Sequence, residues 1–504
     1  MLALFGGVIL GLISGALPGG GLPTLIVLLG FAYYMDPYVA LPLAMGAAAV
    51  NNTSDTIPAV LLGMPGSATG QASILDGHPL ARKGEAGRAL AVSYFASLSG
   101  GIIGAMGFFV AIMGARTIIK AFGSPEFFML SLLGIVMVAV VSSGAFLKGL
   151  LAASFALALT TIGFDNVTGM TRFTYGTEYL WGGLPIVPVL VGLFAMPEMA
   201  NIFISSKPIA EQVGVSANKL EFSRMAAVKE VLQHKWLVVR SSLIGLFVGL
   251  MPGVGGSAAH WLAYGAAYQT EKGARETFGT GDIRGVIAPD CANNSIDGGQ
   301  IVPTLAFGIP GSSHQSIFLA FLLLLGFVPG PNMLNENLDK TILIGLGLVV
   351  ANVIGTGISL YFTPLLAKIA YIRPGILVPL VTVILTLAAF QANFSVGDFL
   401  TVAVFAGVGA LMKVYGWPRP PVIIAIVLGP QLNKYLWLSV QGYGWEMLSR
   451  PQSIAVFALA IATIIFTLRV QKGAGQAAAN VQAGVAENQA DTGSATQPSD
   501  QQEA

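Results

Sequence analysis

A polar stretch inside otherwise apolar sequence constrains this chain more than any other feature. Residues 291–303 read Cys-Ala-Asn-Asn-Ser-Ile-Asp-Gly-Gly-Gln-Ile-Val-Pro, and residues 309–313 read Ile-Pro-Gly-Ser-Ser. Lipid cannot satisfy backbone groups that leave a helix, so irregular backbone at membrane depth must be buried in protein or face a watery cavity. The stretch therefore predicts non-helical backbone at membrane depth that is buried in protein or faces a watery cavity.

The composition places this stretch in a membrane. Of the 504 residues, 54% are hydrophobic and 10% are charged, whereas soluble domains carry about 25% charged residues. Long apolar runs exclude an outer-membrane barrel, whose strands alternate over short segments. The formal net charge of +1 argues against nucleic-acid binding, and the single cysteine, Cys291, excludes a disulfide framework or a cysteine-based zinc site. We predict an all-α polytopic membrane protein with about 10–14 membrane segments.

The polar stretch has a twin in the first half of the chain. Residues 51–55 and 293–297 share the pattern Asn-Asn-x-x-Asp, and each is followed by Pro-Gly-Ser, at 65–67 and 310–312. A Pro-Gly pair also interrupts an apolar segment in each half, at 18–19 and 252–253. The spacing between matching motifs is 234 residues from Pro18 to Pro252, 242 from Asn51 to Asn293 and 245 from Pro65 to Pro310. Such a drift is expected of a duplicated unit with small insertions.

Broken polar segments at matching places in two halves predict inverted repeats that enclose a transport site. We expect each repeat to contain a Pro-Gly-broken helix and a re-entrant hairpin. The expected division is a first membrane repeat at 1–205, a cytoplasmic amphipathic linker at 206–236, a second membrane repeat at 237–470 and a disordered tail at 471–504. Three basic residues, Arg82, Lys83 and Arg88, follow the first hairpin, whereas 329–340 holds only Lys340. Since basic loops favour the cytoplasm, Arg82 is predicted cytoplasmic and Asn335 periplasmic.

The duplicated motifs suit a small carboxylate. Helix N-termini offer free N–H groups and positive potential, and the Pro-Gly-Ser and Asn-Asn elements are predicted to start half-helices aimed at one midplane site. The alternative for the serines is that they only cap their own helices. The predicted substrate-binding residues are Asn51, Asn52, Pro65, Gly66, Ser67, Asn293, Asn294, Pro310, Gly311, Ser312, Pro18, Gly19, Pro252 and Gly253.

Two aspartates, Asp55 and Asp297, are predicted to couple transport to an ion. A carboxylate at membrane depth is costly and by default functional. Each could bind Na⁺ together with unwound carbonyls, or carry a proton; alternatively, each could cap a half-helix. No organic cofactor, catalytic residue or metal site beyond sodium is expected. His260 and His314 are interpreted as packed polar side chains, because two isolated histidines do not make a metal site.

Several longer motifs resemble a known family. They are Gly281-Asp282-Ile283-Arg284-Gly285-Val286-Ile287-Ala288-Pro289-Asp290, Pro329-Gly330-Pro331, Leu75-Asp76-Gly77-His78-Pro79 and the two Pro-Gly-x-Gly turns. From Gly15 to about Arg469 the chain resembles the large membrane subunit of tripartite tricarboxylate transporters, the TctA family. The resemblance implies a secondary transporter of the bacterial inner membrane, with a periplasmic solute-binding protein and a small membrane subunit of about four helices as partners. It also implies small carboxylate substrates, such as citrate, and an ion gradient as the driving force.

The predicted function is therefore ion-gradient-driven uptake of a small di- or tricarboxylate, without enzymatic activity. A homodimer is left open. One alternative is an intramembrane hydrolase in which Asp55 and Asp297 form a carboxylate dyad, although no further catalytic partner stands out. A channel or scaffold subunit is the other alternative, and conduction without an ion gradient would favour it.

Overall fold

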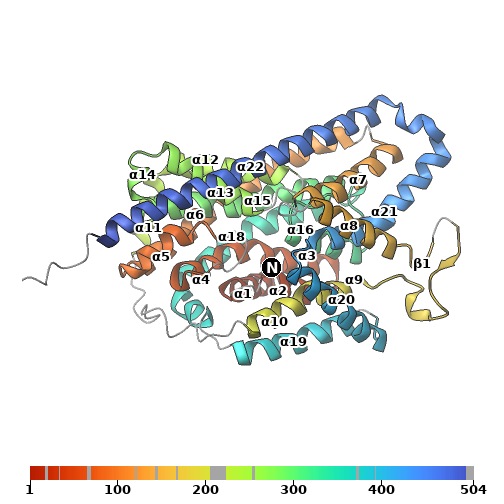
Figure 1. Ribbon diagram of the computed structural model, residues 1–504, viewed down its shortest axis with the longest axis horizontal. Coiled ribbons are helices and arrows are strands. Elements are labelled where there is room, and N and C mark those ends of the chain that lie inside the picture. The colour runs from red at the N-terminus through yellow and green to blue at the C-terminus, as the bar shows by residue number, and fades with distance from the viewer. Residues whose placement is uncertain are drawn as a thin grey trace, which may run out of the picture.

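The computed structural model describes residues 1–17, 21–32, 34–64, 70–119, 122–141, 146–165, 168–204, 223–251, 256–370, 374–391 and 393–494. These residues form a helical bundle (Figure 1) with one two-stranded hairpin, β1 (Gly163–Phe164) and β2 (Thr171–Arg172), which projects from one end. Seven predicted site residues lie outside the described residues: Pro18, Gly19, Pro65, Gly66, Ser67, Pro252 and Gly253. So do residues 206–222 of the predicted linker.

The first half of the chain contributes ten α-helices. They are α1 (Leu2–Ala16), α2 (Gly21–Ala32), α3 (Pro37–Ser54), α4 (Thr56–Leu62), α5 (Ile74–Arg82), α6 (Ala86–Ile119), α7 (Ser124–Val141), α8 (Phe146–Leu159), α9 (Ile186–Leu190) and α10 (Met196–Ile204). A π-helical turn at Val191–Ala195 joins the last two.

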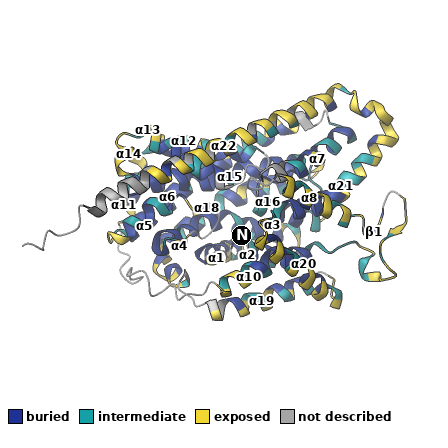
Figure 2. Ribbon diagram, in the orientation of Figure 1, coloured by how far each residue is buried: buried dark blue, intermediate teal, exposed yellow. Residues whose placement is uncertain are grey.

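The second half follows the surface helix α11 (Arg224–Gln233). Its helices are α12 (Lys235–Leu250), α13 (Gly256–Thr270), α14 (Ala274–Thr277), α15 (Arg284–Phe307), α16 (Ser313–Leu324), α17 (Pro331–Leu334), α18 (Leu338–Ala370), α19 (Pro374–Phe390), α20 (Val396–Val414), α21 (Pro420–Tyr443) and α22 (Pro451–Ser494). The central helices are mostly buried, whereas α22 is largely exposed (Figure 2).

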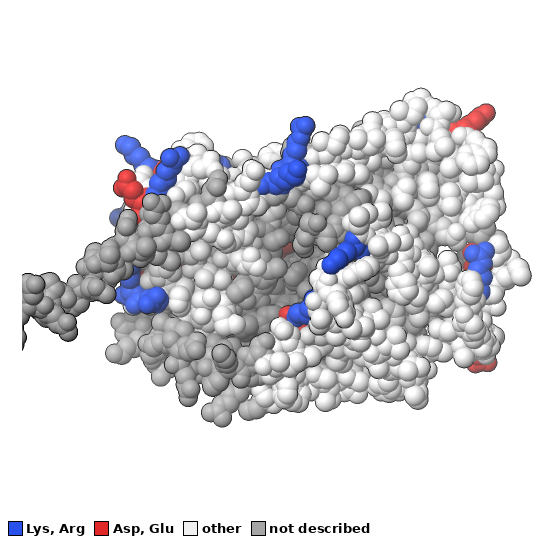
Figure 3. Space-filling view, viewed as in Figure 1, with Lys and Arg blue, Asp and Glu red and all other residues white. Residues whose placement is uncertain are grey.

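Length and composition identify the described helices that could cross a membrane. Six are long and apolar enough: Ala86–Thr117, Ile186–Ile204, Leu338–Ile369, Val396–Val414, Pro420–Leu448 and Pro451–Val470. A broad face with few charged side chains lies between charged ends (Figure 3). These findings confirm the predicted all-α, multi-pass membrane class. The total of 10–14 segments stays a prediction.

Glycines set the close packing of the first helix of each half. A Cβ atom on Gly11 of α1 would lie 2.4 Å from the carbonyl oxygen of Ala47 in α3. A Cβ atom on Gly245 of α12 would lie 2.3 Å from the carbonyl oxygen of Ala292 in α15. The two glycines are 234 residues apart, the same spacing as the Pro-Gly pairs. Small residues at such contacts let membrane helices approach closely, so α1 on α3 and α12 on α15 repeat one packing arrangement.

The structure corrects the prediction of unwound backbone at the two Asn-Asn motifs. Asn51 and Asn52 lie in α3, and Asn293 and Asn294 lie in the middle of the continuous helix α15. These asparagines therefore do not start half-helices. The prediction failed because polar side chains do not require irregular backbone when a neighbouring helix supplies their partners.

The chain turns after these polar helices. Gly63 and Gly308 end α4 and α15 in the left-handed region, with φ of 62° and 70°. In the second half, the turn leads back along α15, and Ser312 caps α16 by accepting a hydrogen bond from the Gln315 amide. The Pro-Gly-Ser motif at 310–312 therefore starts a helix, as predicted.

The loops used to predict topology lie at opposite ends of α6. Arg82 precedes the N-terminus of this helix, whereas Arg116 near its C-terminus donates to Asn335 Oδ1 at 3.4 Å. A helix of 34 residues is about 50 Å long at 1.5 Å per residue. If α6 crosses the membrane, the two loops are on opposite sides.

The linker and tail are helical where they are described. In α11 only Ala227 and Val231 are buried, so this helix lies on the surface. Helix α22 continues to Ser494, through part of the segment predicted to be a disordered tail. Alanine and glutamine are strong helix formers, so a segment with little to bury can still continue a helix.

Candidate substrate and ion site

The two polar helices bind each other through their duplicated asparagines. Asn52 Nδ2 donates to the carbonyl oxygen of Asn293 at 3.2 Å and to Asp297 Oδ2 at 3.0 Å. Asn294 Nδ2 donates in the opposite direction, to Thr53 Oγ1 at 2.8 Å. Each half of the chain therefore supplies an asparagine to the other half, and α3 and α15 meet at the centre of the bundle.

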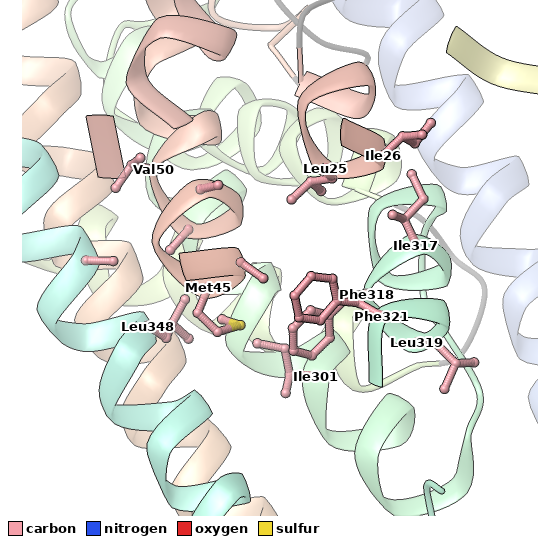
Figure 4. Packing of buried hydrophobic residues seen from close by; sticks show 14 of the residues in the cluster. Leu25, Ile26, Met45, Val50, Ile301, Ile317, Phe318, Leu319, Phe321 and Leu348 are labelled. Carbon is pink, nitrogen blue, oxygen red and sulfur yellow. The ribbon is translucent and has the colours of Figure 1, made fainter. Parts of the chain in front are cut away.

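A small cavity of about 40 Å³ lies beside this crossing. It lies between α3, α15, α16 and α18, and its walls combine apolar and polar side chains. Met45, Ile301, Phe318 and Leu348 form apolar walls, one from each helix (Figure 4). The polar lining residues are Asn52, Asp297, Gln300, Ser312, His314 and Gln315. The volume suits a few water molecules and is smaller than a dicarboxylate requires.

The N-terminus of α16 forms one wall of the cavity. Ser312, His314 and Gln315 are its N-cap and two residues of its first turn, and all three line the cavity. The first amides of a helix lack intrahelical partners and carry the positive end of the helix dipole. This end of the cavity is therefore suited to a negatively charged group.

The predicted ion-coupling aspartates occupy different environments. Asp297 lines the cavity and is hydrogen-bonded to Asn52. Asp55 is buried where α3 meets α4, beside Gly70, on which a Cβ atom would lie 3.4 Å from Asp55 Oδ2. The structure thus places Asp297, but not Asp55, among the residues that line the cavity.

The predicted asparagines also divide. Asn52 lines the cavity, whereas Asn51 accepts a hydrogen bond from Ser14 at 3.2 Å and packs against Gly21, at the break between α1 and α2. Asn294 is fully buried between Thr53 and Asn352. Of the predicted site residues that the structure describes, Asn52, Asp297 and Ser312 line the cavity together.

Sequence reasoning missed several residues around the cavity. Gln300 and Gln315 were not singled out, and His314 was interpreted as a packed side chain. Asn352, in the long apolar helix α18, accepts from Asn294 at 2.8 Å and was also missed. A signal existed for Gln300, because the spacing between the halves grows from 242 to 245 next to it. The only sequence signal for Asn352 was that it is a single amide side chain within an apolar span.

A second buried carboxylate joins the two halves away from the cavity. Asp76 of α5 accepts hydrogen bonds from the amides of Gly279, Gly281 and Asp282 at 2.8–3.0 Å and from the Tyr264 hydroxyl at 2.7 Å. Burial raises the pKa of this carboxyl to about 6, and the hydrogen bonds oppose that shift. Since its four donors all come from the second half, Asp76 clamps the start of α15 to the first half.

No metal cluster is evident in the parts of the chain described above. Among these residues, no three His, Cys, Asp or Glu side chains come together in a way that could hold a metal ion. An alkali cation or a proton at a single carboxylate would not require such a cluster.

Comparison with known proteins gives one family and two relatives. Residues 1–424 match the model of the tripartite tricarboxylate transporter TctA family. An Agrobacterium vitis protein described as "Uncharacterized 52.8 kDa protein in TAR-I ttuC' 3'region" is 28% identical over 92% of both chains. A second A. vitis protein, from the "TAR-II ttuC' 3'region", is 25% identical over 44% of this chain and 93% of its own. No solved structure matches.

Proposed function

The chain belongs to the tripartite tricarboxylate transporter TctA family, and from this premise we propose that it is the permease subunit that takes up a small di- or tricarboxylate. Membership makes it a membrane subunit of a transporter and not an enzyme, so the hydrolase alternative is set aside. Uptake of a specific carboxylate, its coupling and the identity of the partners are parts of the proposal.

One observation carries the proposal: a cavity at the crossing of two polar helices from opposite halves. Transporters built from inverted repeats hold their substrates near the midplane at the repeat interface, often at helix N-termini. Here Asn52, Asp297 and the N-terminus of α16 surround one cavity. A neutral wall of amides and helix N–H groups favours a carboxylate, because it offers donors without a strongly hydrated counter-charge.

The cavity must open during transport. A volume of about 40 Å³ holds a few waters, which is less than a small di- or tricarboxylate needs. The Gly308–Ser312 turn is the element that can enlarge the site, since it connects α15 to the wall formed by α16. Alternating access would require movement of this wall relative to α3 and α18.

We propose Asp297 as the main coupling group. The case for sodium relied on unwound carbonyls beside both aspartates, yet the Asn51 carbonyl accepts the helical N–H of Asp55 and the Asn293 carbonyl accepts from Asn52. These two carbonyls are therefore already hydrogen-bonded, and Asp297 could carry either Na⁺ or a proton. In both cases the cation would offset repulsion between Asp297 and a substrate carboxylate in the same cavity.

The proposed setting is the bacterial inner membrane. A periplasmic solute-binding protein would deliver the substrate, and a small membrane subunit would complete the system, as the tripartite family name implies. A homodimer is compatible with this arrangement but is not required by it.

Uptake by the complete system tests the proposal. The chain and its partner subunits would be reconstituted in liposomes, with labelled citrate, malate and succinate as probes and with Na⁺ or pH gradients imposed separately. Accumulation of at least one carboxylate that disappears when the gradient is collapsed supports the proposal. Equilibration without accumulation in every gradient would instead indicate a channel.

A further inference from the structure

The second half contains a segment that the first half lacks. Asp55 lies three residues before Pro58, whereas Asp297 lies six residues before Pro303. The three additional residues are Gly298, Gly299 and Gln300, and they extend α15 without interrupting it. Gln300 therefore has no counterpart in the first half.

Close packing of the two glycines accommodates this extension. A Cβ atom on Gly298 would lie 2.1 Å from the Gly104 carbonyl oxygen of α6, and one on Gly299 would lie 2.4 Å from the Leu246 carbonyl oxygen of α12. These two faces of α15 are pressed against neighbouring helices. The next residue, Gln300, lines the cavity and is 2% exposed.

The hydrogen bond to Ser312 fixes the orientation of the Gln300 amide. The Ser312 hydroxyl donates to Gln300 Oε1 at 2.9 Å. Gln300 Nε2 has no hydrogen-bond partner among the residues that the structure describes. A buried donor without a partner costs roughly 1–3 kcal/mol, so a ligand that accepts from this amide would recover that free energy.

A second buried polar atom, on another residue that lines the cavity, also lacks a hydrogen-bond partner among the described residues. His314 lies in the first turn of α16, and its Nε2 has no hydrogen-bond partner within the described ranges. A neutral imidazole can present an N–H at this atom. Neither lysine nor arginine is among the described residues that line the cavity. The two unpaired donors are thus neutral.

We propose that Gln300 Nε2 and His314 Nε2 hold one carboxylate group of the transported substrate, together with the N-terminus of α16. This assignment rests on the proposed carboxylate transport. It makes the substrate site asymmetric, because the amide donor comes from an extension that only the second half possesses. Neutral donors also leave no unpaired positive charge in the cavity when the substrate has departed.

The Michaelis constant for substrate tests the two donors. Gln300→Glu keeps the size and the oxygen that accepts from Ser312, but replaces the free donor with an acceptor that repels a carboxylate. We expect the KM for the transported carboxylate to rise about 10-fold or more. His314→Leu should raise the KM similarly, and His314→Gln, which restores an N–H donor, should recover part of the loss.

Gly311 provides an independent test because it makes room for Gln300. A Cβ atom on Gly311 would lie 2.8 Å from Gln300 Cγ, so Gly311→Ala should displace the amide and raise the KM. The same substitution in a Gln300→Ala background should have little further effect, because the displaced atoms are absent. Gly357→Ala is the matched control, since nothing lies within 4 Å of its added Cβ atom.

These outcomes separate the two levels of the proposal. The assignment would be overturned if the KM were unchanged in folded Gln300→Glu and His314→Leu proteins. It would also be overturned if Gly311→Ala raised the KM by the same factor with and without Gln300→Ala. Neither outcome would affect the proposal of carboxylate transport. If the unmodified system accumulates no carboxylate, the proposed function itself fails. Thermal unfolding of each purified variant establishes that it is folded before its kinetics are compared.

Discussion

The polar helix of the first half and its counterpart in the second half share a motif but differ in construction. The first is divided at Asp55 into α3 and the short α4, whereas α15 is continuous over 24 residues. Asn52 of α3 donates to two acceptors on α15. Asn294 of α15 donates to Thr53 in the first half and to Asn352 in α18.

The two polar helices therefore contribute different groups to the cavity. The helix of the first half supplies the donor that orients Asp297, and α15 supplies the carboxylate and the Gln300 amide that line the cavity. Asn294, fully buried, joins α3, α15 and α18. The two halves thus share a polar motif and a helix-packing arrangement, and in our proposal the ligand contacts come mainly from the second half.

The largest expected effect concerns membrane topology. A cysteine on the outer side of the membrane reacts with an impermeant reagent, and a cysteine on the inner side does not. With Cys291 changed to Ser, a cysteine at Asn335 should react with an impermeant reagent added to intact cells, and a cysteine at Arg82 should react only after the membrane is permeabilised. The expectation follows from the basic residues after the first hairpin. Equal labelling of both sites from outside would mean that the repeats are parallel or that a hairpin is wrongly placed.

The next largest effect is expected at the two aspartates. Asp297→Asn should remove the dependence of uptake on the ion gradient and lower the initial rate about 10-fold or more, because Asp297 lines the cavity. Asp55→Asn should have a smaller effect. Rates measured under separate Na⁺ and pH gradients would test this order and identify the ion. A larger loss in Asp55→Asn would show that the first half carries the coupling group.

The asparagines should differ in the property that is affected. Asn52→Ala removes the amide that donates to Asp297, so uptake should fall by roughly 5- to 150-fold, corresponding to about 1–3 kcal/mol. Asn294→Ala should also reduce uptake, but it should additionally lower the melting temperature, because it leaves Thr53 and Asn352 without this donor. Measuring uptake and thermal unfolding on both variants checks this contrast. Wild-type uptake in both variants would show that the crossing of α3 and α15 is not part of the substrate site.

The smallest effects concern packing that the two halves share. Gly15→Ala and Gly249→Ala should each destabilise the protein by roughly 1–3 kcal/mol, because their Cβ atoms would lie 2.4 and 2.5 Å from the carbonyl oxygens of Asn51 and Ile296. Gly357→Ala, which has open space, should be neutral or slightly stabilising. Thermal unfolding of the three purified proteins compares them. If only one of the variants Gly15→Ala and Gly249→Ala lost stability, the two halves would differ in their packing at these glycines.

The sequence predicted the membrane class, the duplicated motifs and the polar centre. Asn52, Asp297 and Ser312 were recognisable because each breaks an apolar context and recurs, or nearly recurs, in the other half. The backbone conformation was not predictable in the same way. Whether a polar residue in a membrane lies in unwound chain or on a helix depends on the partner that faces it, and the partner of Asn52 is 241 residues away.

The distinction between Asp55 and Asp297 also could not be obtained from the sequence. Both follow an Asn-Asn pair by the same spacing, and only three-dimensional packing places Asp297 on the cavity wall and Asp55 beside Gly70. Gln300 was detectable in principle from the changed spacing between the halves. His314 was not, because one histidine near a Pro-Gly-Ser motif does not show which cavity its ring faces.

The carboxylate of Asp76 has a consequence for how the protein is made. Three amides that it accepts from are 203 to 206 residues further along the chain, so they leave the ribosome long after Asp76 has done so. Until then, the first half contains a carboxylate whose native burial would cost several kcal/mol. The packing around Asp76 can therefore be completed only after the second half has been made. A chain interrupted between the halves would be expected to recover its native packing only when both fragments are inserted into the same membrane.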